Sequence, residues 1–149
     1  MAATSGYSGT PLGRKLGLKP GMRVRLLIGP GADAATGYWS RFGPEVDPGA
    51  CHLLDPQDLQ EADFTHLFAR TLAGLREGIA RGRRRMAVNG MMWISWPKKS
   101  SSLGSEIGRA EVMREGQGAG LVDVKVCAVD EDWSGLKFVI PVADRGDRA

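Results

Sequence analysis

The sequence predicts a small α/β protein built on a mostly parallel sheet, with helices on both faces and a C-terminal antiparallel hairpin. Candidate strands alternate with candidate helices, which favours parallel strands joined by right-handed crossovers. The last two candidate strands, 121–129 and 136–142, are close enough in the chain to pair as a hairpin. The chain of 149 residues is 42% hydrophobic and 25% charged, which suits one globular domain. We therefore expect a single domain over 1–149, with flexible tails at 1–5 and 143–149.

Glycine and proline divide the first half of the chain into short elements. Residues 32–50 are rich in both, and the better strand of this half is aromatic and β-branched. The predicted elements are a helix at 12–16 ended by Gly17, a turn at 19–21, a strand at 23–28, a short helix at 37–42, a short strand at 51–54 and a strand at 64–69.

The second half shows clearer periodicity. Leu72, Leu75, Ile79 and Met86 recur at helical spacing. The predicted elements are a helix at 71–86, a turn at Asn89-Gly90, a strand at 91–96, a helix at 102–115, a strand at 121–129, an acidic turn at 130–135 and a strand at 136–142. The helix at 102–115 should be capped by serines, with Leu103, Ile107 and Ala110 inward. The strand at 121–129 should carry Val122, Val124, Val126 and Ala128 on one face.

Composition narrows the classes of protein that fit the chain. A net charge of +3 and a pI near 9.1 permit anionic partners without requiring them. Cys51 and Cys127 lie far apart with no Cys/His cluster, so a disulfide framework or zinc site is not expected. No apolar run approaches the roughly 20 residues of a membrane span, and no signal peptide opens the chain. We expect a cytoplasmic protein with no metal site and no membrane partner.

Two stretches resemble a family of short bacterial proteins classed as a domain of unknown function. The first is GYSGTPLGRKLGLKPGMRVRLL at 6–27. The second is MMWISWPKKSSS at 91–102 joined to LVDVKVCAVDEDWSGLKFV at 121–139. The resemblance spans nearly the whole chain and implies no activity.

A second resemblance is to the Rossmann-like fold of S-adenosylmethionine-dependent methyltransferases, in truncated form. It rests on the LKPG turn, the strand and glycine pair that follow, and the terminal helix, strand and hairpin. That family carries an acidic residue two places before the first glycine of a GxGxG loop, whereas Leu27 stands there and Asp33 replaces the last glycine. A helix and a strand of that fold are missing between Asp55 and Phe64. Asp55 could stand where a ribose-binding carboxylate sits in that family.

Candidate ligand-binding residues follow the predicted parallel strands. Ligands bind such sheets beyond the carboxyl ends of the strands. Glycines let a ligand approach the backbone, while lysines, hydroxyls and free amides at the start of a helix bind anions. The alternative for SWPKKSSS is a capped helix start with a solvated basic loop. The candidates are Gly29, Pro30, Gly31, Asp55, Arg70, Lys98, Lys99, Ser100, Ser101 and Ser102.

Other conspicuous residues have simpler explanations. His66 lies in an apolar strand and is interpreted as a hydrogen-bonded core residue. Trp93 and Trp96 have opposite parity, so they should pack on opposite faces of the sheet. Trp133 falls in the predicted turn and is expected to cover the sheet edge or a partner. The arginines at 81–85 are interpreted as the solvated end of a helix, so nucleic acid is not an expected partner.

The sequence therefore favours a non-catalytic module that binds an anionic small molecule or a protein partner, which could be a second copy of the chain. No catalytic residue is identified, and the cofactor is unknown. The alternatives are an S-adenosylmethionine-dependent methyltransferase-like enzyme and a nucleic-acid accessory protein. The first follows from the resemblance, and the second from the basic residues alone.

Overall fold

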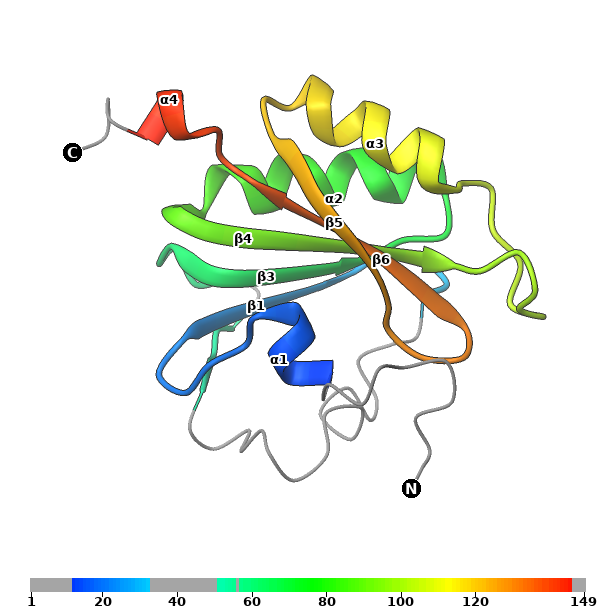
Figure 1. Ribbon diagram of the computed structural model, residues 1–149, viewed down its shortest axis with the longest axis horizontal. Coiled ribbons are helices and arrows are strands. Elements are labelled where there is room, and N and C mark those ends of the chain that lie inside the picture. Colours follow the sequence, from blue (N-terminus) through cyan, green and yellow to red (C-terminus); the bar gives the residue numbers. More distant parts are fainter. Residues whose placement is uncertain (1–11, 33–50, 56, 146–149) are drawn as a thin grey trace.

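The computed structural model describes residues 12–32, 51–55 and 57–145, which form a mixed sheet between two layers of helices (Figure 1). α2 and α3 cover one face of the sheet, and the short α1 packs on the other. The elements are α1 (Leu12–Leu16), β1 (Arg23–Ile28), β2 (His52–Leu53), β3 (Ala62–Phe68), α2 (Leu72–Arg84), β4 (Met86–Pro97), α3 (Arg109–Gly118), β5 (Val122–Ala128), β6 (Trp133–Val139) and α4 (Val142–Arg145). None of the helices in the described ranges is long and apolar enough to cross a membrane.

The strand order across the sheet is β2-β1-β3-β4-β6-β5. β1 pairs in parallel with β2 and β3, and β3 pairs in parallel with β4. β6 is antiparallel to both of its neighbours, β4 and β5. The prediction of a mostly parallel sheet with a C-terminal antiparallel pair is therefore confirmed. Because β1, β3 and β4 run the same way, their carboxyl ends share one edge.

The core consists of one apolar cluster on each face of the sheet. On the α2 and α3 side, Leu75 and Val112 pack against Met92, Trp96 and neighbouring sheet residues. On the α1 side, the cluster contains Leu12, Leu16, Val24, Phe64, Phe68, Trp93, Val129 and Trp133. Trp93 and Trp96 lie in different clusters, which confirms that they face opposite sides. The indole N–H of Trp93 donates to the carbonyl oxygen of Leu16 at 2.8 Å, and this bond fixes α1 against the sheet.

β4 differs from its prediction because it begins at Met86 and runs through Asn89-Gly90. Met86 is opposite Ala62 of β3, but the next pair joins Phe64 to Met91, so β4 carries extra residues at a bulge. The expected turn at Asn89-Gly90 is therefore wrong. A Cβ on Gly90 would lie 2.9 Å from the carbonyl oxygen of Ala62. The neighbouring strand approaches so closely there that only glycine fits.

The helix expected at 102–115 begins seven residues later, at Arg109, and ends at Gly118. Its N-cap is Gly108, whose N–H donates to the Glu111 carboxylate at 2.7 Å. Ser102 and Leu103 lie in an exposed loop, so the serine cap and the inward Leu103 are wrong, as is the inward Ala110, which is exposed. Ile107 is buried as expected.

The C-terminal hairpin is tighter than predicted. β6 begins at Trp133, which is 5% exposed and meets Phe68 edge to face with ring centroids 5.1 Å apart. Trp133 is therefore a core residue and does not cover the sheet edge. In β5 a bulge lies between Asp123 and Lys125. Because directly paired residues share a face, this bulge puts Val122 and Val126 on opposite faces, contrary to the prediction.

The remaining predictions concern segments that the structure describes only in part. α4 (Val142–Arg145) begins at the last residue of the strand expected at 136–142 and continues into the stretch expected to be a tail. The helix expected at 37–42 and the tails at 1–5 and 146–149 lie outside the described residues.

Candidate functional site

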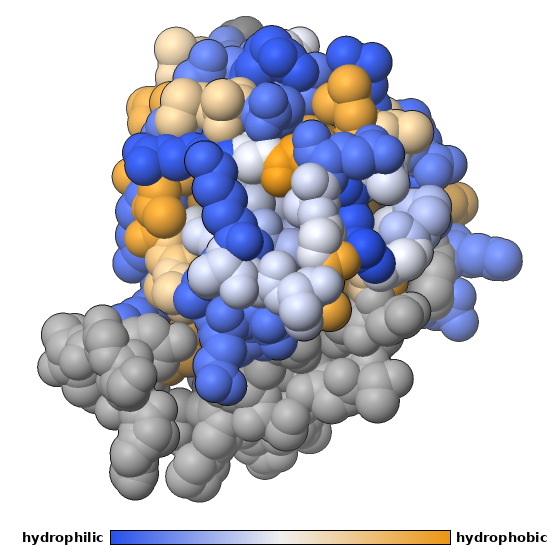
Figure 2. Space-filling model, turned by 90° about the vertical axis from the view of Figure 1, so that its right-hand side faces the viewer, coloured by the Kyte–Doolittle hydropathy of each residue, from blue (hydrophilic) through white to orange (hydrophobic). Residues whose placement is uncertain are grey.

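Three strand ends meet at the carboxyl edge of the sheet. β1 continues into Gly29-Pro30-Gly31, β3 into Arg70, and β4 into Lys98. This edge faces the viewer in Figure 2, where hydrophilic and intermediate residues cover most of the coloured surface and apolar residues form scattered patches. The sequence therefore predicted correctly which segments come together here.

Arg70 connects these strand ends through its guanidinium group. Nη1 donates to the carbonyl oxygen of Gly31 at 2.9 Å, and Nε donates to that of Gly104 at 3.0 Å. Nη2 donates to the carbonyl oxygen of Leu103. The backbone oxygen of Arg70 also accepts from the N–H of Glu106 at 2.8 Å. Arg70 thus holds the loop after β4 against the glycine loop after β1.

The N-terminus of α2 lies beside Arg70 and is already capped. Thr71 is the N-cap, and its hydroxyl accepts from the N–H of Gly74 at 3.0 Å. The Glu106 carboxylate accepts from the N–H of Leu72 at 3.3 Å. These groups satisfy two of the amides that an anion would otherwise use.

A pocket of about 720 Å³ lies between the end of β4 and the start of α3. Its volume is within the range of about 300 to 1,000 Å³ that is usual for small-molecule sites. Its lining combines apolar and charged side chains, and consists of Trp96, Pro97, Lys98, Lys99, Ser101, Gly104, Ser105, Glu106, Ile107, Gly108, Arg109, Ala110 and Glu111.

The charges that line this pocket are unevenly compensated. Within the described part of the chain, no ion pair involves Lys98, Lys99 or Arg109. The two carboxylates, by contrast, are occupied at the N-termini of helices: Glu106 at α2 and Glu111 at α3. Backbone N–H groups, first that of Gly108, lower the pKa of Glu111, and the Lys99 charge adds a minor contribution. The pocket therefore offers three cations to a ligand.

The three candidate serines differ in position. The Ser101 hydroxyl donates to the Asp132 carboxylate at 2.9 Å and accepts from the N–H of Leu103 at 3.1 Å, so it shapes the loop as well as lining the pocket. Ser100 and Ser102 are exposed and do not line the pocket. The free amides expected at a Ser102 helix start do not exist, because no helix begins there.

Asp55 lies apart from the other candidates. β2 pairs only with the first two residues of β1, so the chain reaches Asp55 well short of the glycine loop. A turn then begins, in which the N–H of Asp58 donates to the carbonyl oxygen of Asp55 at 2.9 Å. The Asp58 carbonyl oxygen in turn accepts from the guanidinium of Arg25 in β1. This turn returns the chain toward the amino edge.

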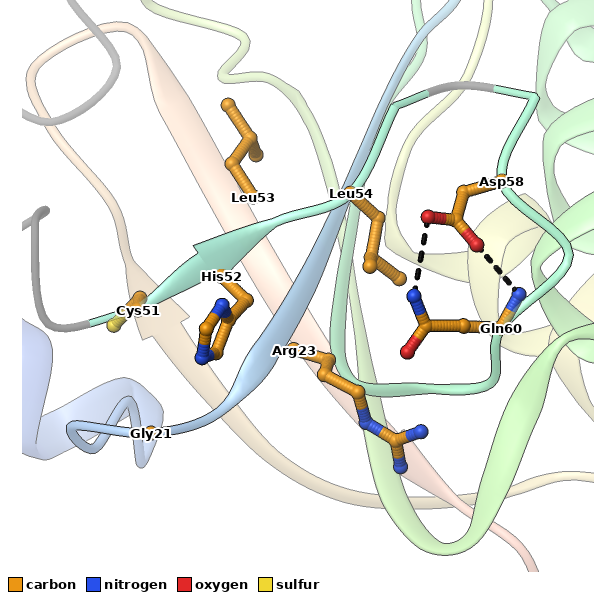
Figure 3. Close-up of a pocket in the computed structure, with 8 residues that line it drawn as sticks. All are labelled: Gly21, Arg23, Cys51, His52, Leu53, Leu54, Asp58 and Gln60. Atoms are coloured by element: carbon orange, nitrogen blue, oxygen red, sulfur yellow. Dashed lines mark hydrogen bonds between the residues drawn. The ribbon is translucent and has the colours of Figure 1, made fainter.

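A second pocket, of about 700 Å³, lies beside the starts of β1 and β2 (Figure 3). Its lining includes Arg23 and His52, but Arg23 already forms an ion pair with Asp63 at 3.1 Å. Figure 3 also shows that Asp58 bonds to Gln60 and not to Arg23. No group of three or more His, Cys, Asp or Glu residues could hold a metal ion in the described ranges.

Sequence reasoning missed Glu106, Arg109 and Glu111, which were assigned to the middle of a helix. The signal that could have identified them is the pair Gly104 and Gly108. Glycine costs about 1 kcal/mol relative to alanine in a helix interior, so two glycines in five residues argue against a helix there. Gly104 has a φ of 76°, which a helix cannot contain.

Comparisons with known proteins support the fold. No protein-family model and no curated protein matches the sequence. Solved structures do match, including a SAM-dependent methyltransferase from Aquifex aeolicus (18% identity, TM-score 0.54, 86% of this chain and 87% of that chain). Others are a TehB-like SAM-dependent methyltransferase from Corynebacterium glutamicum (13%, 0.52, 91% and 90%) and a ribosomal protein L11 methylase from Lactobacillus delbrueckii (9%, 0.57, 87% and 75%). The chain therefore has a methyltransferase-like, Rossmann-like fold.

The described residues at the glycine loop do not fit S-adenosylmethionine in the way the resemblance implies. The position of the family's acidic residue holds Leu27, which is 5% exposed and packs in the core beneath α2. The carbonyl oxygen of Gly31 is bonded to Arg70, and Asp55 lies elsewhere.

Proposed function

We propose that this chain is a small-molecule binding module of methyltransferase-like fold, which holds an anionic ligand in the pocket between β4 and α3. The observation that carries the proposal is the set of Lys98, Lys99 and Arg109 around a pocket of about 720 Å³, without ion-pair partners in the described ranges. Hydrogen bonds to charged groups contribute about 1.5 to 3 kcal/mol each, so these cations favour a carboxylate or phosphate. A module that only binds a ligand needs no catalytic residue.

The second candidate is S-adenosylmethionine-dependent methyl transfer. The solved neighbours support this candidate more directly than the first, because those named above are methyltransferases or methylases that match most of the chain. At sequence identities of 9% to 18%, the similarity to these structures shows the fold alone. Leu27 and the Arg70 contacts weigh against it. A protein partner, including a second copy of the chain, remains a prediction.

A thermal-shift screen separates the two candidates. The wild-type protein would be heated with S-adenosylmethionine, S-adenosylhomocysteine, nucleotides and phosphorylated or carboxylated metabolites. A ligand at 100 times its Kd stabilises the native state by about 2.7 kcal/mol, which is a readily measured shift. A shift with S-adenosylmethionine and its demethylated product makes the methyltransferase the favoured function. A shift with other anions alone supports the binding module.

Paired variants then locate the site of any ligand found. Lys98→Gln with Lys99→Gln removes two charges from the pocket and should weaken binding at least tenfold. Lys19→Gln with Lys125→Gln is the matched control, because both lysines are exposed and neither lines the pocket. Exposed substitutions of this kind change stability by less than about 0.5 kcal/mol. Equal affinity in both double variants would exclude the pocket between β4 and α3.

A further inference from the structure

A third pocket lies at the opposite edge of the sheet, beside the C-terminus of α2. It has a volume of about 250 Å³ and differs in chemistry from the pocket between β4 and α3. Its lining consists of Arg25, Leu27, Gln57, Asp58, Leu59, Arg81, Arg84 and Arg85. Four arginines and one acidic residue thus line a small space. We call these four arginines the arginine pocket.

Arg25 is the unusual member of the arginine pocket because it is a buried cation with no ion-pair partner among the described residues. It lies in β1 on the face covered by α2 and is only 2% exposed. Its guanidinium donates to the carbonyl oxygens of Asp58, Gln60 and Arg85, all of which are neutral acceptors. Burial of a charge is costly unless an opposite charge compensates it. The three carbonyls accept from three of the five N–H groups of Arg25 and leave its charge in place.

The charged residues around Arg25 do little to compensate its charge. Burial lowers the pKa of Arg25, and the positive charges of Arg85 and Arg81 lower it further, while the charge of Asp58 acts in the opposite sense. The Asp58 carboxylate is itself bonded to the backbone N–H and side-chain amide of Gln60 (Figure 3). Across the described ranges, no ion pair involves any of the four arginines.

Helix α2 partly explains the position of the other three arginines. Cations are favoured in the last turn of a helix by its dipole, which accounts for Arg81, Arg84 and Arg85 as exposed residues. The dipole does not explain why β1 brings a fourth, buried arginine to the same place. An anion bound among them would offset part of this positive charge.

We propose that the arginine pocket binds a phosphate group carried by a small molecule. Guanidinium groups match phosphate oxygens with paired hydrogen bonds, which lysines cannot form. The volume is below the range of about 300 to 1,000 Å³ for whole ligands, so it suits one phosphate with the remainder of the molecule outside. Leu59, which is 69% exposed, offers an apolar surface to that remainder. This site is independent of the pocket between β4 and α3.

The test measures binding by isothermal titration calorimetry with four probes: inorganic phosphate, pyrophosphate, AMP and a single-stranded DNA 12-mer. The variant is Arg81→Gln with Arg84→Gln, which changes two exposed side chains and should change stability by less than about 0.5 kcal/mol. The matched control is Lys19→Gln with Lys125→Gln, which removes the same charge from two exposed side chains that line neither this pocket nor the pocket between β4 and α3. We expect phosphate probes to bind wild type and the control alike, and the arginine variant at least tenfold more weakly. Higher salt should weaken binding to wild type.

Arg25→Gln provides a second measurement. Because Arg25 also bonds to the carbonyl oxygens of Asp58 and Gln60, this variant could lose stability, so urea unfolding is measured with and without pyrophosphate. Pyrophosphate should stabilise wild type and not Arg25→Gln, whatever the starting stability of the variant.

Four outcomes would overturn the proposal or part of it. Absence of binding by every probe to wild type, or equal binding by the arginine variant, rejects the arginine pocket. Loss of binding in Lys98→Gln with Lys99→Gln, while the arginine variant binds as wild type does, also rejects it and supports the proposed function instead. Binding of the 12-mer alone, with a steep salt dependence, rejects a small molecule as the source of the phosphate and identifies a nucleic-acid backbone.

Discussion

His66 and Ser95 form a fully buried polar pair between β3 and β4, with the Nε2 of His66 2.7 Å from the Oγ of Ser95. The His66 ring also stacks on Phe68, with ring centroids 4.2 Å apart. Buried polar groups are costly unless they are hydrogen-bonded, and this contact meets that requirement. The sequence-based interpretation of His66 as a hydrogen-bonded core residue is confirmed.

Replacement of Ser95 by alanine should therefore destabilise the fold. The change leaves the Nε2 of a buried imidazole without this partner, at a cost of about 1 to 3 kcal/mol. Urea unfolding at pH 7 measures the effect. Ser134→Ala is the control, because Ser134 lies in β6 and is only half-buried. A loss below about 0.5 kcal/mol, the usual surface value, would mean that the contact contributes little.

Two glycines of α3 should respond in opposite directions to alanine. A Cβ on Gly116 would lie 2.3 Å from the Phe138 ring, so Gly116→Ala should cost about 1 to 3 kcal/mol through overpacking. A Cβ on Gly118 would meet nothing within 4 Å, so Gly118→Ala should stabilise by about 0.4 to 1 kcal/mol. Chemical denaturation of the two variants side by side gives the comparison. A stable Gly116→Ala protein would show that α3 can move away from β6.

The ion pair between Arg23 and Asp63 should make stability depend on acidity. The hydrogen bond from Arg23 holds the pKa of Asp63 below its ordinary value of 3.8. The stabilisation is therefore present at neutral pH and is lost as the pH falls through the folded-state pKa. Both side chains are about a third exposed, so solvent screening limits the effect to about 1 kcal/mol or less.

Asp63→Asn tests this sign directly. The variant should be less stable than wild type at pH 7, and the difference should shrink as the pH falls from about 5 toward 2. Unfolding curves across that range provide the measurement. A difference that grows on acidification would contradict the assignment of Asp63 as the titrating group.

Arg70→Met should loosen the loop at 98–108 without unfolding the sheet. The change removes three hydrogen bonds from the charged guanidinium to backbone carbonyls. In this partly exposed site, their loss should lower the free energy of unfolding by about 1 to 3 kcal/mol. Limited proteolysis should show faster cleavage within the loop. Arg76→Met is the control, since Arg76 forms an exposed ion pair with Glu115 that contributes at most about 1 kcal/mol. Equal cleavage of both variants would remove the structural role assigned to Arg70.

The regular part of the fold follows from local pattern and was predicted well. The predicted strand at 23–28 has the same bounds as β1 (Arg23–Ile28). Glycine and proline flank this segment on both sides and so mark where it begins and ends. The parallel order of β1, β3 and β4 follows from alternation with helices. Asn89-Gly90 misled the prediction, because this pair is a common turn signal and its role as a bulge depends on the neighbouring β3. No local pattern carries that information.

The candidate site was predicted in outline but not in composition. Lys98, Lys99 and Ser101 line the pocket because they follow a strand, as the sequence indicated. Arg70 was expected to contact a ligand, whereas its side chain binds three backbone carbonyls. Arg25 was missed because an arginine within a strand carries no sign that it will be buried. Contacts between distant segments decide both cases.

The bulge in β5 has a consequence for how copies of this chain behave when crowded together. β5 is an edge strand with Val122, Val124 and Val126 each more than 40% exposed, a composition that favours strand-to-strand aggregation. The irregularity between Asp123 and Lys125 interrupts the even row of N–H and C=O groups that an incoming strand would need. It also turns Val122 away from Val126, so the valines do not form one continuous apolar strip. The same extra residue that misaligns the hairpin thus protects the open edge of the sheet against fibril-like growth.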